Sequence, residues 1–309
     1  MKKYLLIVGA LCFGINIGLS QQDKLLTHFI FDKMSINPGA TAMGMGSQAC
    51  GTMIYRNQWD QFSGAPNSVL ANAEANISEY FIPSGVGISF YHDAIGFSRQ
   101  NNVTLNYSYH LPLVTGTLGI GVGLGLNSFG ISPTWVTPDQ NPNDGSLPAA
   151  VNEAVFDANI GVYYLDKSGW YAGLSSTHLP SFELEQLNFN TARHYYAMGG
   201  YLLSDAFNVN SFDLEGNILV RSDLVRLSSD INVRAIWDDT FYGGLTYRTS
   251  DAIGIMAGMN YKSFTFGYSY DITVNRISSV SAGSHELLFR YCYPLPPLPI
   301  TKSRNPRYL

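Results

Sequence analysis

Four glycines at every second position are the residues whose spacing first suggests chemistry. The stretch TLGIGVGLGLNSFG contains them as Gly119, Gly121, Gly123 and Gly125. Glycine-rich loops cradle phosphates, but a dinucleotide site needs a strand, a glycine turn and then a helix whose N-terminus meets the pyrophosphate. Here the glycines alternate with Leu, Ile and Val, and the following ISPTWVTPDQNPNDGSLP cannot form a helix. The pattern therefore indicates a strand with one apolar face and one bare face.

The other reactive residue types form no catalytic or metal-binding pattern. Six histidines are scattered through the sequence without His-x-x-x-His spacing, and no Cys-x-x-Cys pair accompanies them. The serines include no nucleophile elbow, and no two carboxylates are identifiable as an acid and base couple. We therefore expect no enzyme, no bound cofactor and no metal site.

The first twenty residues have the pattern of a secretory signal peptide. Lys2 and Lys3 precede an apolar stretch that is too short for a spanning helix, and the small residue Ser20 follows it. Cleavage near Ser20 removes both lysines and changes the formal net charge from −5 to −7. Such an acidic chain is an improbable partner for nucleic acid, and we exclude nucleic-acid binding.

The composition favours a membrane barrel over a soluble domain. Only 13% of the residues are charged, whereas 20 tyrosines and 17 phenylalanines are present. Soluble domains usually contain about 25% charged residues. A soluble β-sandwich would also show alternation, but its exposed face would carry more Lys and Glu. The aromatic residues fit the interfacial girdles of an outer-membrane barrel.

Fourteen segments of about ten residues alternate between apolar and polar positions and are separated by turn-forming residues. They lie near 47–58, 67–78, 84–92, 99–110, 117–129, 153–165, 169–178, 192–203, 210–220, 228–237, 240–249, 251–261, 263–272 and 283–293. In the segment 192–203 the outward face is ambiguous, because Tyr195 and Tyr196 compete for it. The fold class predicted is all-β, a transmembrane antiparallel β-barrel whose closure satisfies the backbone of every strand. The even count and the alternation of long and short connections predict periplasmic N- and C-termini.

Three further parts of the chain are expected beside the signal peptide at 1–20. Residues 21–46 form an N-terminal segment in which Leu25, Leu26, Phe29 and Met34 could share a helical face. Residues 47–293 form the barrel, and the Pro-rich tail at 294–309 leaves it into the periplasm. The bare glycine face either relieves crowding or receives an inserted element. The candidates for that element are segment 21–46, the loop at 130–152 and a partner peptide.

Arg56 and Gln58 face the lumen by alternation. We expect Arg56 to pair with a lumen carboxylate rather than to hold a partner directly. The carboxylates with inward parity are Glu74, Asp157, Glu215 and Glu286, the last a neighbour only if the barrel closes. Trp59 is interpreted as an interfacial anchor and Gly64-Ala65-Pro66 as a tight turn, with an external contact surface as the alternative.

Cys50 and Cys292 lie at the periplasmic ends of the first and last predicted strands and face inward. A closing disulfide between them is one alternative in an oxidising compartment. We favour two buried free thiols, because the strand register is unknown and a disulfide requires close Cβ atoms.

Three stretches together resemble the PorP/SprF family of outer-membrane proteins of the type IX secretion and gliding machinery of Bacteroidetes. They are QQDKLLTHFIFDKMSINPGATA, MIYRNQWDQFSGAPNSVLANAEANI and GVGISFYHDAIGFSRQNNVTLNYSYHLPL. The combination of Asn37-Pro38, Tyr55-Arg56-x-Gln58-Trp59 and Gly64-Ala65-Pro66 is specific. Lys24-Leu25 and Ala40-Thr41 depart modestly from the family pattern.

The resemblance implies an outer-membrane barrel that supports secretion, assembly or surface anchoring of a partner adhesin. The partners implied are a large adhesin with a type B C-terminal signal, other periplasmic and outer-membrane secretion components, and membrane lipid or lipopolysaccharide. A passive porin or small-solute transporter of similar strand number is the alternative.

Overall fold

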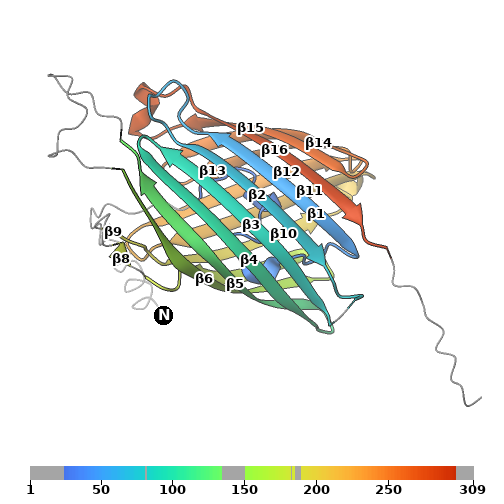
Figure 1. Cartoon of the computed structure of the whole chain (residues 1–309). Coiled ribbons are helices and arrows are strands. Elements are labelled where there is room, and N and C mark those ends of the chain that lie inside the picture. The colour runs from blue at the N-terminus through green and yellow to red at the C-terminus, as the bar shows by residue number, and fades with distance from the viewer. Residues whose placement is uncertain (1–23, 81, 134–149, 182, 185–188, 297–309) are drawn as a thin grey trace, which may run out of the picture.

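The chain forms a closed antiparallel barrel of fourteen strands (Figure 1). The computed structural model describes residues 24–80, 82–133, 150–181, 183–184 and 189–296. The barrel strands are β1 (Gln48–Asn57), β2 (Asn67–Asn76), β3 (Ser84–Ile95), β4 (Ser98–Pro112), β5 (Gly116–Ile131), β6 (Val151–Asp166), β7 (Trp170–Thr177), β10 (His194–Leu203), β11 (Phe212–Ser222), β12 (Leu227–Trp237), β13 (Phe241–Arg248), β14 (Ala252–Tyr261), β15 (Phe264–Thr273) and β16 (Ser284–Pro294). Two short strands, β8 (Glu183–Leu184) and β9 (Phe189–Asn190), pair with each other between β7 and β10. The predicted fold class is confirmed.

Alternation places the apolar side chains outside and the polar ones in the lumen. On β12, Ile231 and Val233 are exposed whereas Asp230 and Asn232 are buried. This inverted pattern suits a barrel in lipid, where the outer face meets hydrocarbon. The described residues contain no helix that is long and apolar enough to cross a membrane.

The two ends of the barrel differ in their connections. We call the loop end the one that carries the connections β1–β2, β3–β4, β5–β6, β7–β10, β11–β12, β13–β14 and β15–β16. The turn end carries the remaining, generally shorter connections, together with the start of β1 and the end of β16. The 3-10 turn η3 (Ala206–Asn208) lies at the turn end, and η4 (Arg276–Ser279) lies at the loop end.

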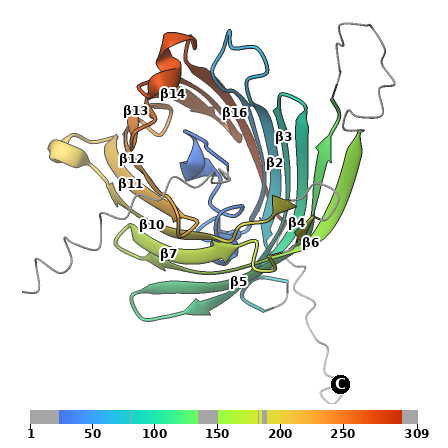
Figure 2. The same ribbon diagram turned by 90° about the vertical axis from the view of Figure 1, so that its left-hand side faces the viewer.

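Residues 24–46, which we call the lumen segment, lie inside the barrel (Figure 2). The segment contains two 3-10 turns, η1 (Phe29–Phe31) and η2 (Pro38–Ala40), and no α-helix. The expectation of a shared helical face is therefore wrong. Its side chains contact the barrel wall on several sides, and the side chain of Asn37 accepts a hydrogen bond from the Gly39 N–H to start η2. The fold of this segment is set by the wall rather than by helical periodicity.

The barrel closes where β1 pairs with β16. In this pairing Cys50 lies directly opposite Cys292, and the two are joined by a disulfide. The preference for two free thiols is therefore wrong. The register that alternation alone left undetermined brings the two sulfur atoms together at the turn end of the closure.

We predict that the variant C50S/C292S unfolds more easily while keeping the barrel fold. The disulfide links positions separated by 242 residues, and loss of such a crosslink typically costs about 2 to 4 kcal/mol of unfolding free energy. Denaturant unfolding in detergent micelles measures the loss, and reducing the wild-type protein provides the control. An unchanged unfolding midpoint in both samples would contradict a stabilising role for this crosslink.

Candidate functional site: the occupied lumen

The lumen segment lies with its backbone directly against glycines of the barrel wall. A Cβ atom on Gly39 would lie 2.9 Å from the carbonyl oxygens of both Gly119 and Gly161. A Cβ on Gly119 would overlap the carbonyl of Gly39, and one on Gly121 would overlap the backbone of Pro38. The inserted element that packs against this bare face is thus the N-terminal segment. Any larger residue at these wall positions would force the two backbones apart.

Gly123 and Gly125 have a different neighbourhood from the first two glycines. A Cβ on Gly123 would lie 2.6 Å from the Asn106 Oδ1 atom, and one on Gly125 would overlap the carbonyl of Val103. These two glycines therefore relieve crowding between neighbouring strands. Both interpretations of the glycine face apply, each to one half of the run. The loop at 130–152, the other element considered for insertion, lies partly outside the described residues.

Hydrogen bonds between the lumen segment and the wall hold the segment in place. The Asn37 Nδ2 atom donates to the carbonyl of Val162 at 2.9 Å, and Ser108 Oγ donates to the carbonyl of Gly39 at 3.0 Å. At the turn-end side, the Ala42 N–H donates to Glu74 at 2.7 Å. These bonds satisfy backbone groups that are removed from water, which would otherwise be costly.

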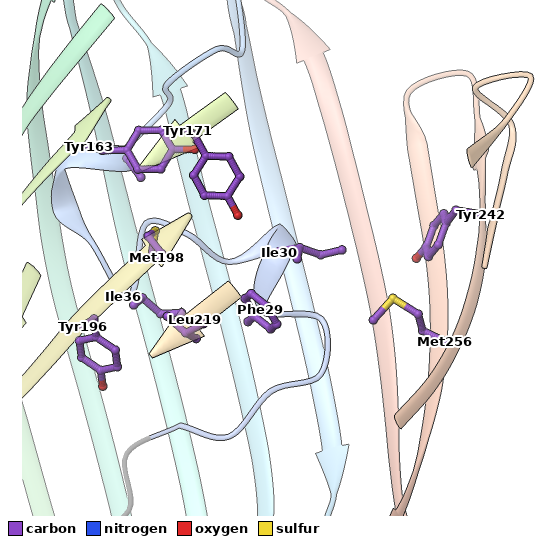
Figure 3. Packing of buried hydrophobic residues seen from close by; sticks show 11 residues of the cluster. Phe29, Ile30, Ile36, Tyr163, Tyr171, Tyr196, Met198, Leu219, Tyr242 and Met256 are labelled. Carbon is purple, nitrogen blue, oxygen red and sulfur yellow. The ribbon is translucent and has the colours of Figure 1, made fainter. Parts of the chain in front are cut away.

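An apolar cluster packs the lumen segment against the part of the wall that runs from β6 to β14. Figure 3 shows Phe29, Ile30 and Ile36 of the segment facing inward-pointing side chains of several strands. The wall residues of the cluster are Tyr163, Tyr171, Tyr196, Met198, Leu219, Tyr242 and Met256. Tyr196 is thus the inward residue of the ambiguous segment, and Tyr195 is exposed. The cluster joins the lumen segment to the inward-facing side chains of six strands, β6, β7, β10, β11, β13 and β14.

A chain of ion pairs follows the inside of the wall near the loop end. We call it the ionic belt: Arg221 (β11), Asp230 (β12), Arg248 (β13), Asp271 (β15), Glu286 (β16) and Arg56 (β1). All six residues are between 0% and 6% exposed. The belt passes β14 at Gly254, where a Cβ would lie 2.6 Å from Asp271 Oδ1. A side chain there would interrupt the belt.

Arg56 joins the first strand to the last two through this belt. Its Nη2 atom lies 2.7 Å from Asp271 Oδ2, and its Nη1 lies 3.0 Å from Glu286 Oε2. The register places Arg56 directly opposite Glu286. The ion pairs therefore hold together the strands at the closure of the barrel.

The lumen segment binds the same carboxylates. The backbone N–H groups of Thr27 and His28 both donate to Glu286, at 3.0 and 2.7 Å. The Thr27 hydroxyl lies 2.7 Å from both carboxylate oxygens of Asp271. Closure of the barrel and seating of the segment therefore depend on one shared set of buried acids.

The alternation of inward and outward positions predicted four candidate partners for Arg56. One of them, Glu286, pairs with Arg56 in the structure. Glu74 is 4.0 Å from Arg290, Asp157 pairs with His178 at 2.9 Å, and Glu215 pairs with Arg234. Asp271 was not among the predicted partners, although Asp271 lies two residues after Ser269 and therefore faces the lumen like Ser269. Assigning every residue of the second-last strand to the inner or the outer face would have identified it.

The loop after β1 is held by local contacts. Gln58 is buried, and its N–H donates to the carbonyl of Pro66 at 2.9 Å. Trp59 has a positive φ of 53°, and its N–H donates to Ser284 Oγ at 3.1 Å. The carbonyl of Gly64 accepts from the Gly96 N–H at 3.0 Å. These contacts tie the loop to its neighbours, and their partners all lie within the barrel's own connections and strands.

The described chain begins at the loop end and finishes at the turn end. The carbonyl of Lys24 accepts a hydrogen bond of 2.7 Å from Arg221, next to the last residue of β11. Leu25 lines a cavity between the connections of the loop end. Both termini themselves lie outside the described residues, so their expected periplasmic location stays a prediction. The lumen segment crosses the whole barrel before β1 begins. The predicted signal peptide at 1–20 and most of the tail at 294–309 lie outside the described residues.

Comparisons with known proteins agree with this architecture. A family model described as "Type IX secretion system membrane protein PorP/SprF" matches residues 18–291. Among solved structures, the chain is similar to the CymD monoaromatic hydrocarbon channel, with a TM-score of 0.55 and 11% identity over 85% of this chain and 92% of that one. The toluene transporter TbuX of Ralstonia pickettii has a TM-score of 0.49 and 10% identity over 85% and 93%. A comparison with curated protein sequences finds no match.

We predict that Gly121→Leu displaces the lumen segment without opening the barrel. The leucine side chain needs the volume that the backbone of Pro38 and Gly39 occupies. Limited proteolysis should then cut within residues 24–46, which are protected in the wild type. The matched control is Gly216→Leu, because no atom lies within 4 Å of a Cβ at Gly216. Equal protection of the segment in both variants would contradict the contact.

We predict that Arg56→Met lowers the free energy of unfolding by about 3 to 5 kcal/mol, because it removes the arginine from buried Glu286 and leaves buried Asp271 with Arg248 at 3.5 Å. Denaturant unfolding in micelles measures this loss. Arg99→Met is the control, since Arg99 is exposed and bonds only to the nearby carbonyls of Gly96 and Ser98 among the described residues. A loss no greater than that of the control would show that the belt is dispensable.

Proposed function

The chain belongs to the PorP/SprF family of type IX secretion system membrane proteins, and from this premise we propose that it supports secretion, assembly or surface anchoring of a partner adhesin. The family match over residues 18–291 carries the proposal. The partner is a large surface protein with a type B C-terminal signal, and other components of the secretion system hold the barrel in place. The protein's work is binding and positioning, and it catalyses no reaction.

The occupied lumen supports this role over that of a passive channel. A channel needs a continuous water-filled path, whereas here the lumen segment packs on glycine backbone on one side and on an apolar cluster on the other. The likeness to a hydrocarbon channel keeps a small-solute transporter as the second candidate, but at 11% identity that likeness concerns the fold alone.

We further propose that the loop end faces the outside of the cell. Outer-membrane barrels have short periplasmic turns and longer external loops. In this orientation Lys24 lies at the external mouth of the barrel. Leu295, which follows β16, lies on the periplasmic side.

This topology predicts opposite labelling of two variants that each add one free cysteine to the chain, whose Cys50 and Cys292 are joined in a disulfide. Lys24→Cys should react with a membrane-impermeant maleimide on intact cells, because Lys24 lies at the loop end. Lys262→Cys, in the exposed β14–β15 turn, should react only after the outer membrane is permeabilised. Labelling of the Lys24 variant only after permeabilisation would show that the barrel has the opposite orientation or that the segment runs in the opposite direction.

Affinity purification from the native outer membrane in mild detergent, with mass spectrometry, tests the function. We expect one large surface protein to be recovered together with secretion components. Deletion of the gene should remove that same protein from the cell surface, and complementation should restore it. A barrel recovered without partners, together with an unchanged surface proteome in the deletion strain, would favour the transporter.

A further inference from the structure

A cavity of about 320 Å³ opens at the loop end beside the start of the lumen segment. Leu25 forms part of its lining. Arg221 of β11 and Arg248 of β13 contribute to it, together with Asp223 and Arg226 of the β11–β12 connection. Asp251 follows β13 in the same lining. Because the lumen segment lies directly below, a molecule that enters this cavity is held at the mouth and does not pass through.

The hydrogen bonding of Arg248 indicates that the cavity binds a ligand. It is 2% exposed, its Nε donates to Asp230 at 2.7 Å, and its Nη1 lies 3.4 Å from Asp251. Its Nη2 is buried and has no hydrogen-bond partner among the described residues. A buried guanidinium N–H without an acceptor is costly. An oxygen anion in the cavity would complete the bonding of this group.

The charges of the lining select the kind of anion. Three arginines and two aspartates, Asp223 and Asp251, line the cavity. Arg221 and Arg248 already pair with Asp230 of the ionic belt, so Arg226 is the arginine of the lining that stands outside the belt. A polyanion such as a lipid phosphate would be repelled by the two carboxylates. A single carboxylate with N–H donors next to it matches both the positive and the negative side chains of the lining. The arginines bind the carboxylate, and the aspartates accept hydrogen bonds from the N–H groups.

The end of a polypeptide chain has this combination of groups. Its C-terminal carboxylate lies on the same residue as a backbone N–H donor, and capture of such carboxylates is a recurring mode of peptide recognition. The volume is at the lower limit of the range for small-ligand pockets, about 300 to 1,000 Å³. It therefore fits a short chain end and excludes a folded domain.

We propose that this loop-end cavity binds the C-terminal carboxylate of a polypeptide, with Arg248 Nη2 as the central donor and Arg226 at the rim. Only the identity of that polypeptide, the surface partner, rests on the proposed function. The binding chemistry itself is a property of the cavity.

Titration calorimetry of the purified full-length protein in detergent tests the site with the tripeptide N-acetyl-Ala-Ala-Ala, as free acid and as C-terminal amide. We expect the acid to bind at least ten times more tightly than the amide. Equal binding of the two, or no binding of either, would overturn the proposal. Tighter binding of inorganic phosphate than of the acid would overturn it in favour of a phosphate or lipid headgroup site.

Two variants and a control assign the effect to the named residues. Arg248→Lys keeps the charge but loses Nη2, so it should weaken binding of the acid at least ten-fold. Arg226→Gln, whose side chain is exposed, should weaken it several-fold without affecting the fold. Arg276→Gln, an exposed arginine in η4 at the loop end, should change nothing. Equal effects of all three would show that general charge, not this cavity, binds the peptide. Absence of peptide binding by the wild-type protein, with the partner still recovered in affinity purification, would refute the proposed cavity site and leave the proposed function standing.

Discussion

Direct contact between two backbones is the constraint on which the rest of this structure depends. The lumen segment approaches the wall so closely that glycines are required on both sides, Gly39 on the segment and Gly119, Gly121 and Gly161 on the strands. Such an approach leaves no layer of water between segment and wall. The barrel therefore encloses a packed core, and its strands face lipid on one side and this core on the other.

The closure of the barrel and the seating of the segment are not separate features. Arg56, Asp271 and Glu286 join β1 to β15 and β16, and the same two acids receive Thr27 and His28 of the segment. Buried charges of this kind are tolerated only when each is paired and hydrogen-bonded. A barrel closed without the segment would leave those acids short of donors. The chain thus favours assembly of the barrel around its own N-terminal segment.

Alternation in the sequence was sufficient to place all fourteen strands and the lumen-facing glycines. It also identified Glu286 as a neighbour of Arg56 once the barrel closes. The same alternation places Asp271 on the inner face. It could not give the path of residues 24–46, because that path is set by contacts with distant strands and not by local periodicity. The disulfide between Cys50 and Cys292 depends on strand register. A period of two leaves register open whenever turns of unknown length intervene.

The most direct test of an occupied lumen is conductance of the purified wild-type protein in planar lipid bilayers. The account predicts no steady open channel at moderate voltage, because the lumen segment fills the barrel from the loop end to the turn end. Deletion of residues 24–46 should produce conductance if the barrel still closes. Steady, ohmic single-channel currents from the intact wild-type protein, comparable to those of a porin, would contradict the account.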